Sequence, residues 1–407
     1  MKYDLFVYAV NNLKSRFLRS GLTILSILIG IMAIFVLVSF GQGLSKYTAD
    51  TFEKMGTNKI MIQPKGFGPP GSSSSSFSDS DLKAIGKVSG TDVVAGMYFT
   101  YGEVKRDTKS RMAPLYVQTM GVPVDGKEGQ LVLDMLTVDV IDGKYLRDSD
   151  KQKIVAGYSY AQENKAFVKP IGAGDSIIVH GVEMKVNGIL DSIGNPADDK
   201  TIIMPIDYYE ELFDVEDSYT YVYVTVKEDF SPSVVADKVA EELRDNKNQE
   251  EGQEDFHVQT FEDLMKTSGA VLMIINSIVI IIALISVVVA AINITNTMYT
   301  SVLERTQEIG IMKAIGARNS DILSIFLVES GIIGLLGGLV GIGLGFAISK
   351  LGGFAAAAGG FAMLQPYFPV WLFVFCLGFS TSIGMVSGLL PALNASKQKP
   401  VDALRYE

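Results

Sequence analysis

Residues 270–292 read AVLMIINSIVIIIALISVVVAAI, a stretch dominated by Ile, Val and Ala. A helix needs about 20 mostly apolar residues to cross the hydrocarbon layer of a membrane. This stretch is long enough and contains no charged residue. It therefore predicts a membrane-spanning helix, and with it an integral membrane protein.

Three further stretches have the same character: 22–40, 322–348 and 370–393. The first carries no charge, and it is too long for the apolar region of a signal peptide. The Gly41-Gln42-Gly43 that follows it is a poor cleavage site, so the helix is expected to be retained. The sequence thus predicts four transmembrane helices.

Basic residues near the spans set the expected orientation, because cytoplasmic loops are enriched in Lys and Arg. They gather before the first span, between the second and third, and after the fourth. Both termini are therefore predicted to be cytoplasmic, in a multi-pass protein of the cell (plasma or inner) membrane. The segment Gly43–Gly269, with a net charge of about −14, is predicted to lie outside the cytoplasm.

This long segment alternates short β-like runs with helical ones, which predicts an α+β domain inserted between helices 1 and 2. A hairpin is expected around the glycine turn at Gly181. The Gly/Ser tract Gly66–Ser80 is predicted to be a flexible loop. The expected strands are 59–63, 93–100, 115–120, 176–180, 182–190 and 219–227, and the expected helices are 79–88, beginning at a capping Ser78 or Asp79, and 232–245.

Several function classes are excluded or disfavoured. The net charge of −10 argues against a nucleic-acid partner. The lone Cys376 cannot form an intrachain disulfide, and His180 and His257 lack the neighbours of a zinc site. No G-x-x-x-x-G-K-[ST] phosphate loop occurs, so no ATPase, catalytic residue or cofactor is expected on this chain.

The segment 301–318, SVLERTQEIGIMKAIGAR, joins the second and third spans. It is predicted to form a short amphipathic helix that Gly316 ends. Its polar neighbours are Glu304, Arg305 and Glu308, and its apolar ridge, suited to a protein groove, is Ile309, Met312 and Ile315. An interfacial helix that touches only lipid headgroups fits the periodicity equally well.

The third span contains two candidate functional features. Its small residues form a G-x-x-x-G stripe that lets helices approach closely, either inside one subunit or at a dimer seam. Glu329 is an intramembrane carboxylate and therefore a candidate functional residue, but snorkelling to the cytoplasmic end of the span or pairing with a base such as Arg305 is favoured over an independent role. The glycines concerned are Gly334, Gly337, Gly338, Gly341 and Gly345.

The predicted organisation follows from these segments. Residues Tyr3–Leu18 show helical spacing of apolar residues and are expected to form an interfacial helix or a plain extension of the first span. The predicted boundaries are 1–20 for the cytoplasmic N-terminal helix, 21–43 for span 1, 44–268 for the outer domain with stalk segments at both ends, 269–297 for span 2, 298–321 for the cytoplasmic loop, 322–349 for span 3, 350–369 for an outer loop, 370–393 for span 4 and 394–407 for the cytoplasmic tail.

The stretch ERTQEIGIMKAIGA at 304–317 resembles the motif E-R-T-x-E-I-G-I-x-x-A-I-G-A of MacB/FtsX-type ABC transporter permeases. The C-terminal PALNASKQKPVDALRYE at 391–407 is similar to the ending of that family. Residues 18–30, 56–63 and 142–146 also resemble its landmarks, so the resemblance covers nearly the whole chain.

The resemblance implies a split permease whose ATPase is a separate cytoplasmic subunit of the MacB/LolD type, which binds the ATP and Mg. It also implies a second permease copy or paralogue, contact with membrane lipids, and possible accessory proteins outside the cell membrane. Motion would pass through stalks at 43–55 and 261–269. The implied ATPase-coupling residues are Glu304, Arg305, Glu308, Ile309, Gly310, Met312, Lys313, Ile315 and Gly316.

Two functions follow from this resemblance. The first is export or extraction of a lipid, lipoprotein, peptide or amphiphile outside the membrane. The alternative is an FtsX-like regulatory complex that activates an extracytoplasmic hydrolase. A receptor or adhesin without an ATPase would leave the motif at 304–317 unexplained.

Overall fold

The computed structural model describes residues 17–66, 75–107, 113–137 and 139–400, which divide into two compact units. The helical unit comprises 17–44, 271–355 and 365–400. The inserted domain comprises Ser45–Ala270 and Ala356–Leu364. Most of the predicted N-terminal helix and of the predicted flexible serine loop lies outside the described residues.

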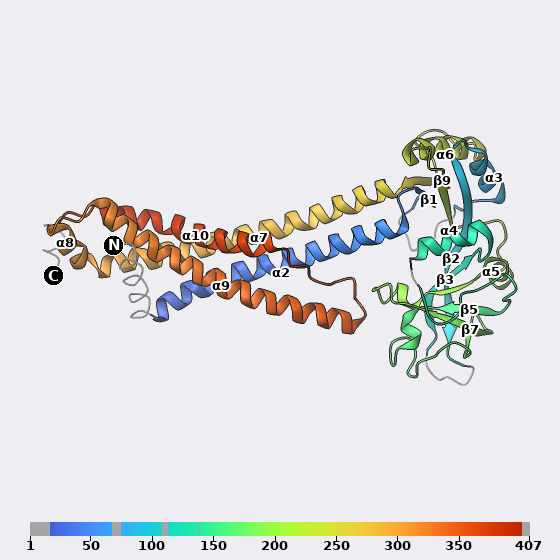
Figure 1. Cartoon of the computed structure of the whole chain (residues 1–407), viewed down its shortest axis with the longest axis horizontal. Helices are drawn as coiled ribbons and strands as arrows, with labels where there is room; N and C mark the ends of the chain where they lie inside the picture. The colour runs from blue at the N-terminus through green and yellow to red at the C-terminus, as the bar shows by residue number, and fades with distance from the viewer. Residues whose placement is uncertain (1–16, 67–74, 108–112, 138, 401–407) are drawn as a thin grey trace. The chain divides into compact units, whose positions relative to one another are not determined.

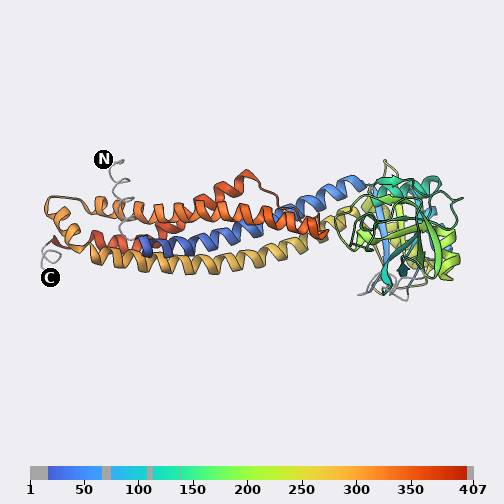
Figure 2. The same ribbon diagram turned by 90° about the horizontal axis from the view of Figure 1, so that it is seen from below.

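Among the described residues, four helices are long and apolar enough to cross a membrane, which confirms the prediction of four spans. They run alongside one another in both views of the chain (Figures 1 and 2). A shorter helix, α8 (Thr306–Ala314), follows the second of these helices in the sequence and precedes the third. The four are α2 (Phe17–Met55), α7 (Phe261–Glu304), α9 (Asn319–Gly359) and α10 (Val370–Ser396).

The core of the helical unit draws on all four long helices. Ile27, Ile31 and Phe35 recur every four residues on α2, so one face of that helix enters the core. The other helices contribute Ile294, Met298, Phe326, Ile333, Leu372 and Cys376. The spans thus form a packed bundle rather than independent anchors.

The inserted domain is built on a ten-stranded, mostly antiparallel sheet (Figure 1). The strand order is β10-β1-β9-β2-β3-β8-β5-β7-β4, and β6 pairs with β2 and β7. Two pairs are parallel, β3 with β8 and β5 with β7. The strands are β1 (Lys59–Pro64), β2 (Thr91–Lys105), β3 (Leu115–Val122), β4 (Val140–Gly143), β5 (Lys153–Ala156), β6 (Ser176–Val179), β7 (Val182–Leu190), β8 (Ile202–Pro205), β9 (Tyr221–Val226) and β10 (Phe256–Thr260).

Helices cover both faces of this sheet. Side chains alternate along β9: Val222 and Val224 pack toward α3 and α6, whereas Tyr221 and Tyr223 pack toward α4. A third cluster lies between α5 and the strands β3 and β8. The helices are α3 (Asp79–Lys87), α4 (Gly126–Leu136), α5 (Ile206–Phe213) and α6 (Pro232–Asn246), with short 3-10 turns η1 (Tyr158–Ala161) and η2 (Asp198–Lys200).

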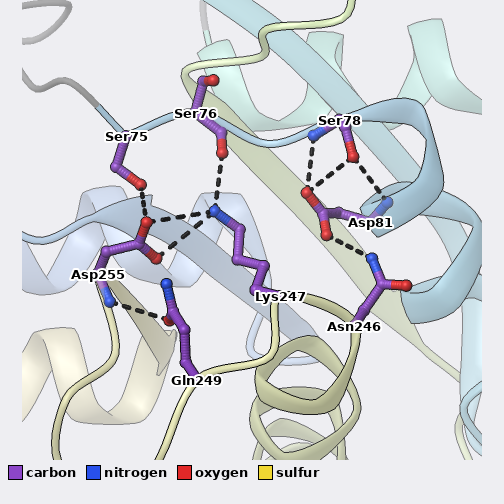
Figure 3. A network of polar contacts seen from close by, with 8 residues as sticks. All are labelled: Ser75, Ser76, Ser78, Asp81, Asn246, Lys247, Gln249 and Asp255. Carbon is purple, nitrogen blue, oxygen red and sulfur yellow. Dashed lines mark hydrogen bonds and ion pairs between the residues drawn. The ribbon is translucent and has the colours of Figure 1, made fainter.

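A polar network fixes the start of α3 beside the end of α6 (Figure 3). The Ser78 backbone N–H donates to Asp81 Oδ2 at 2.8 Å, and the Ser78 side chain caps the helix in return. Asn246 Nδ2 donates to Asp81 Oδ1 at 2.6 Å, and Lys247 Nζ donates to the Ser76 carbonyl at 2.9 Å. These contacts confirm Ser78 as the predicted cap of this helix.

The prediction of an α+β insertion after the first span is confirmed. The predicted hairpin is also present, with His180 and Gly181 at positive φ between β6 and β7. The sequence analysis missed α4, α5, β4, β5, β8 and β10. All four residues of β8 are buried, so this strand lacks the alternation that reveals a strand in sequence.

Candidate coupling site

The segment that follows α7 turns sharply at Arg305. The helix α7 ends at Glu304, Arg305 leaves the helical region with φ −113° and ψ 17°, and α8 begins at Thr306. The prediction of one helix through 301–316 is therefore wrong, because a break separates two helices. Gly316 has φ +100°, a backbone conformation that favours glycine, and it ends α8 as predicted.

Arg305 forms a buried ion pair with Glu329 on α9. The Arg305 Nη1 to Glu329 Oε2 distance is 3.0 Å, and the two side chains are only 5% and 7% exposed. Arg305 Nε also contacts Glu308 Oε2 at 3.1 Å, and the guanidinium lies 5.3 Å from the Phe326 ring centroid. The predicted pairing of Glu329 with Arg305 is confirmed, and Glu329 acts here as the partner of a base rather than alone.

Further contacts hold α8 along its length. Ile309, one turn after Arg305, is fully buried in the core of the helical unit, and Gly310 is buried beside it. Lys313 Nζ donates to Asn319 Oδ1 at 2.8 Å and to the Ser396 carbonyl. The helix is therefore tied to α9 at its start and to both α9 and α10 near its end.

The opposite face of α8 is exposed. Ile311 is 54% and Ile315 81% exposed, four residues apart on one side of the helix. Glu304, Gln307, Glu308 and Ala314 are also exposed. The predicted ridge of Ile309, Met312 and Ile315 is wrong as an exposed surface, because Ile309 is buried and Met312 packs against the core.

Two family models match this chain. The MacB-like periplasmic core domain matches residues 20–244, and the FtsX-like permease C-terminal model matches residues 280–400. An uncharacterised ABC transporter permease of Methanocaldococcus jannaschii is 39% identical over 99% of this chain and 98% of its own length. The chain belongs to the MacB/FtsX-type ABC transporter permeases.

Other relatives of this permease include larger proteins. The macrolide export ATP-binding/permease protein MacB of Campylobacter fetus is 31% identical over the whole chain, which spans 61% of that protein. The crystal structure of the periplasmic region of MacB from Actinobacillus actinomycetemcomitans matches 55% of this chain and 97% of its own, with 16% identity and a TM-score of 0.43.

In this permease the glycine stripe of α9 faces α2 of the same chain. A Cβ added at Gly337 would lie 2.8 Å from Ile27 Cβ, and one at Gly341 would lie 2.9 Å from the Leu28 carbonyl oxygen. A Cβ at Gly345 would lie 3.1 Å from Phe35 Cβ. These distances leave no room for a second chain at the stripe.

The other two glycines of the stripe, Gly334 and Gly338, face α10. A Cβ added at Gly334 would lie 2.4 Å from the Ser380 carbonyl oxygen, and Gly338 meets the Ser380 side chain. From the side of α10, a Cβ added at Gly384 would lie 2.5 Å from the Ser330 carbonyl oxygen. The stripe therefore packs inside one subunit, and the alternative of a dimer seam along these glycines is wrong.

The sequence analysis missed the matching surface on α10. Ser380, Gly384 and Gly388 recur every four residues and face Ser330 and Gly334 of α9. This small-x-x-x-small spacing is the same signal that drew attention to α9, so a scan of the fourth span for it would have found the partner.

Proposed function

We propose that this permease receives motion from a separate cytoplasmic ATPase of the MacB/LolD type through the exposed face of α8. One observation carries the proposal, namely that the two faces of α8 differ. Ile311 and Ile315 are exposed on one face. The other face is attached to the bundle through Arg305, Ile309 and Lys313. A partner that presses on such a helix moves the bundle with it, since Ile309 and the Arg305–Glu329 ion pair behind it are buried and the ion pair is directional.

The motion would reach the inserted domain through two long helices. The strand β1 begins shortly after α2 ends, and α7 begins directly after β10. These two strands are neighbours, with Ile60 opposite Thr260. Phe52 of α2 and Phe261 of α7 pack edge to face at a centroid distance of 5.8 Å. Both helices thus end on one pair of bonded strands, which supports a direct mechanical path.

The cargo class that we propose is a lipid, lipoprotein, peptide or amphiphile exported or extracted outside the membrane. A second copy or a paralogue of the chain, membrane lipids and an accessory protein are the other proposed partners. The regulatory alternative, activation of an external hydrolase, would use the same face of α8. The two are separated by whether the inserted domain binds a small amphiphile.

The coupling proposal is tested by charge placement on α8. The chain is co-expressed with an ABC ATPase of the MacB/LolD type from the same genome and purified in nanodiscs through a tag. Ile315→Asp and Ile311→Asp place a charge in the proposed contact and should remove the ATPase from the purified complex, because a desolvated unpaired charge costs several kcal/mol. Ile141→Asp, at an exposed Ile of β4, is the matched control and should retain it.

Full ATPase retention by both α8 variants would contradict the proposal and would favour the interfacial helix. Met312→Asp does not test docking, because Met312 packs against the core of the helical unit. That substitution is expected to reduce the yield of folded protein instead.

A further inference from the structure

A cavity of about 460 Å³ lies within the inserted domain. This volume falls in the range of small-molecule sites, about 300–1,000 Å³. Its walls come from the end of α2, the strands β2, β3, β7 and β8, the end of α4 and the 192–201 segment.

One wall belongs to the helix that also forms the first span. Tyr47, Thr51, Lys54 and Met55 line the cavity, and their spacing places them on one face of α2. The Tyr47 hydroxyl donates to the Ile193 carbonyl at 2.6 Å. This bond joins the helix to the segment opposite, so the position of α2 helps to set the shape of the cavity.

The inner lining is apolar. Phe99, Met135, Leu190 and Ile203 line the cavity with side chains that are otherwise buried, and Met120 is half-buried. Methionine side chains are flexible and adapt to aliphatic ligands of different shape. The lining therefore suits an alkyl chain better than a flat or strongly polar group.

The polar groups of the lining are already engaged with the protein. Thr201 Oγ1 and Gln118 Oε1 share a hydrogen bond of 3.0 Å. Asp198 Oδ2 accepts from Asn195 Nδ2 at 2.8 Å, and burial raises the pKa of the Asp198 carboxyl. These groups need no ligand to satisfy them.

Lys54 differs from the other polar groups. It is exposed, and among residues 17–66, 75–107, 113–137 and 139–400 it forms no ion pair. Lys54 also lines a neighbouring cavity of about 500 Å³, whose lining includes the carboxylates of Asp134 and Asp139. In that cavity the Asp134 Oδ2 atom lies 3.8 Å from Lys59 Nζ. Within the described part of the chain, Lys54 thus brings a cation that is in no ion pair to a cavity with a largely apolar lining.

We propose that this cavity binds an anionic amphiphile with a single aliphatic chain, whose tail lies among Phe99, Met120 and Met135 and whose head lies at Lys54. Fatty acids, lysophospholipids and acylated peptides with an acidic head share this chemistry. The inference rests on the proposed export function and names its cargo class. Because α2 forms one wall, movement of this helix would open or narrow the site.

A tryptophan reporter tests binding in the full chain in nanodiscs. The single native Trp371 is replaced by Phe, and Phe99→Trp places a fluorophore in the lining. The probe is 12-bromododecanoic acid, whose terminal bromine quenches a nearby indole. Saturable quenching is expected, and Lys54→Glu should weaken apparent affinity by about tenfold. Lys87→Glu, an exposed lysine of α3, is the matched control and should leave affinity unchanged.

Two comparisons make the result decisive. The same bromododecyl chain on a trimethylammonium head should bind the unaltered lysine site at least about tenfold more weakly than the carboxylate does. In Lys54→Glu this difference in affinity between the two probes should be smaller. A Phe230→Trp reporter, on the loop before α6, should show no saturable quenching. Unsaturable quenching at Phe99→Trp, equal quenching at Phe230→Trp, or no effect of Lys54→Glu would overturn the proposal.

A second measurement protects the test against misfolding of the reporter variant. The unaltered chain is cross-linked with a diazirine-bearing dodecanoic acid and digested for mass spectrometry. Adducts are expected within residues 47–55, 118–120 and 135–137, and adducts confined to the membrane spans would contradict the site. Competition by dodecanoate and by dodecyl phosphate distinguishes a carboxylate head from a phosphate head. None of these assays needs the ATPase, so failure of ATPase docking would leave the binding result standing.

Discussion

The helices α7 and α9 belong to the same bundle and have similar lengths, 44 and 41 residues, yet their surfaces differ. In the most apolar 18-residue stretch of α9, 44% of the residues are buried, and glycines let α2 and α10 approach this helix on two sides. In the corresponding stretch of α7, 0% of the described residues are buried, and many are exposed Ile and Val. The helix α9 therefore packs against its neighbours in the bundle, whereas α7 exposes its apolar surface to the surroundings.

This difference shows how a membrane bundle divides its contacts. Lipid tails are as apolar as Ile, so apolarity alone does not hold helices together, whereas small residues permit close packing. Glycine positions on α9 should therefore tolerate little change, and exposed positions on α7 should tolerate much. Substitutions matched between the two helices test this contrast.

The largest effect is expected at the ion pair that joins the end of α7 to α9. Glu329→Ala leaves Arg305 buried without its carboxylate, which costs about 3–5 kcal/mol. The yield of folded protein and its thermal stability in detergent should fall sharply. Glu308→Ala removes the exposed partner of the same arginine and should cost about 1 kcal/mol or less.

A double substitution separates charge from packing. Arg305→Met with Glu329→Leu removes both charges at similar volume, and it should recover much of the stability lost in Glu329→Ala. Lack of any recovery would show that the pair does more than neutralise its own charges.

The next effect in size is expected at the contact of α9 with α10. Gly334→Ala forces a Cβ to 2.4 Å from a backbone oxygen, so the helices must separate at a cost of about 1–3 kcal/mol. Gly343→Ala is the matched control on the same helix, because a Cβ there meets nothing within 4 Å. Equal melting temperatures for the two variants would contradict the packing described for α9.

The sequence predicted the number of spans, and it offered the pairing of Arg305 with Glu329 and the packing of the glycine stripe inside one subunit among its alternatives. These follow from local chemistry, since a carboxylate in an apolar run needs a partner and glycines need a close neighbour. The exposed face of α8 did not follow. Periodicity shows that Ile309 and Ile315 lie on definite faces, but only the surrounding helices decide which face is covered.

The cavity beside Lys54 could not be predicted from the sequence either. Its lining comes from segments as far apart as Tyr47 and Ile203, and each lining residue by itself reads as an ordinary core or surface residue. One of its walls belongs to β8, whose four residues are all buried and therefore lack the alternation that reveals a strand in sequence.

A smaller effect is expected where α7 begins. The Thr260 hydroxyl caps the first turn, exchanging hydrogen bonds with Asp263 at 2.6 Å and 3.1 Å. Thr260→Ala removes this cap and should cost about 1 kcal/mol. Thr260→Ser keeps the hydroxyl and should restore most of the stability in a thermal melt, and equal losses in both variants would show that the cap does not contribute.

The smallest effect is expected on the exposed face of α7. Ile281→Val deletes one methylene from a side chain that is 57% exposed, so the change should stay within about 0.5 kcal/mol. The same substitution at Ile333, which is 1% exposed on α9, removes packing and should cost about 0.5–1.5 kcal/mol. Melting curves of the two variants in one detergent measure the contrast directly. An equal loss at Ile281 would mean that another chain covers α7, and repeating the melt at rising protein dilution would then show a concentration-dependent midpoint for Ile281→Val.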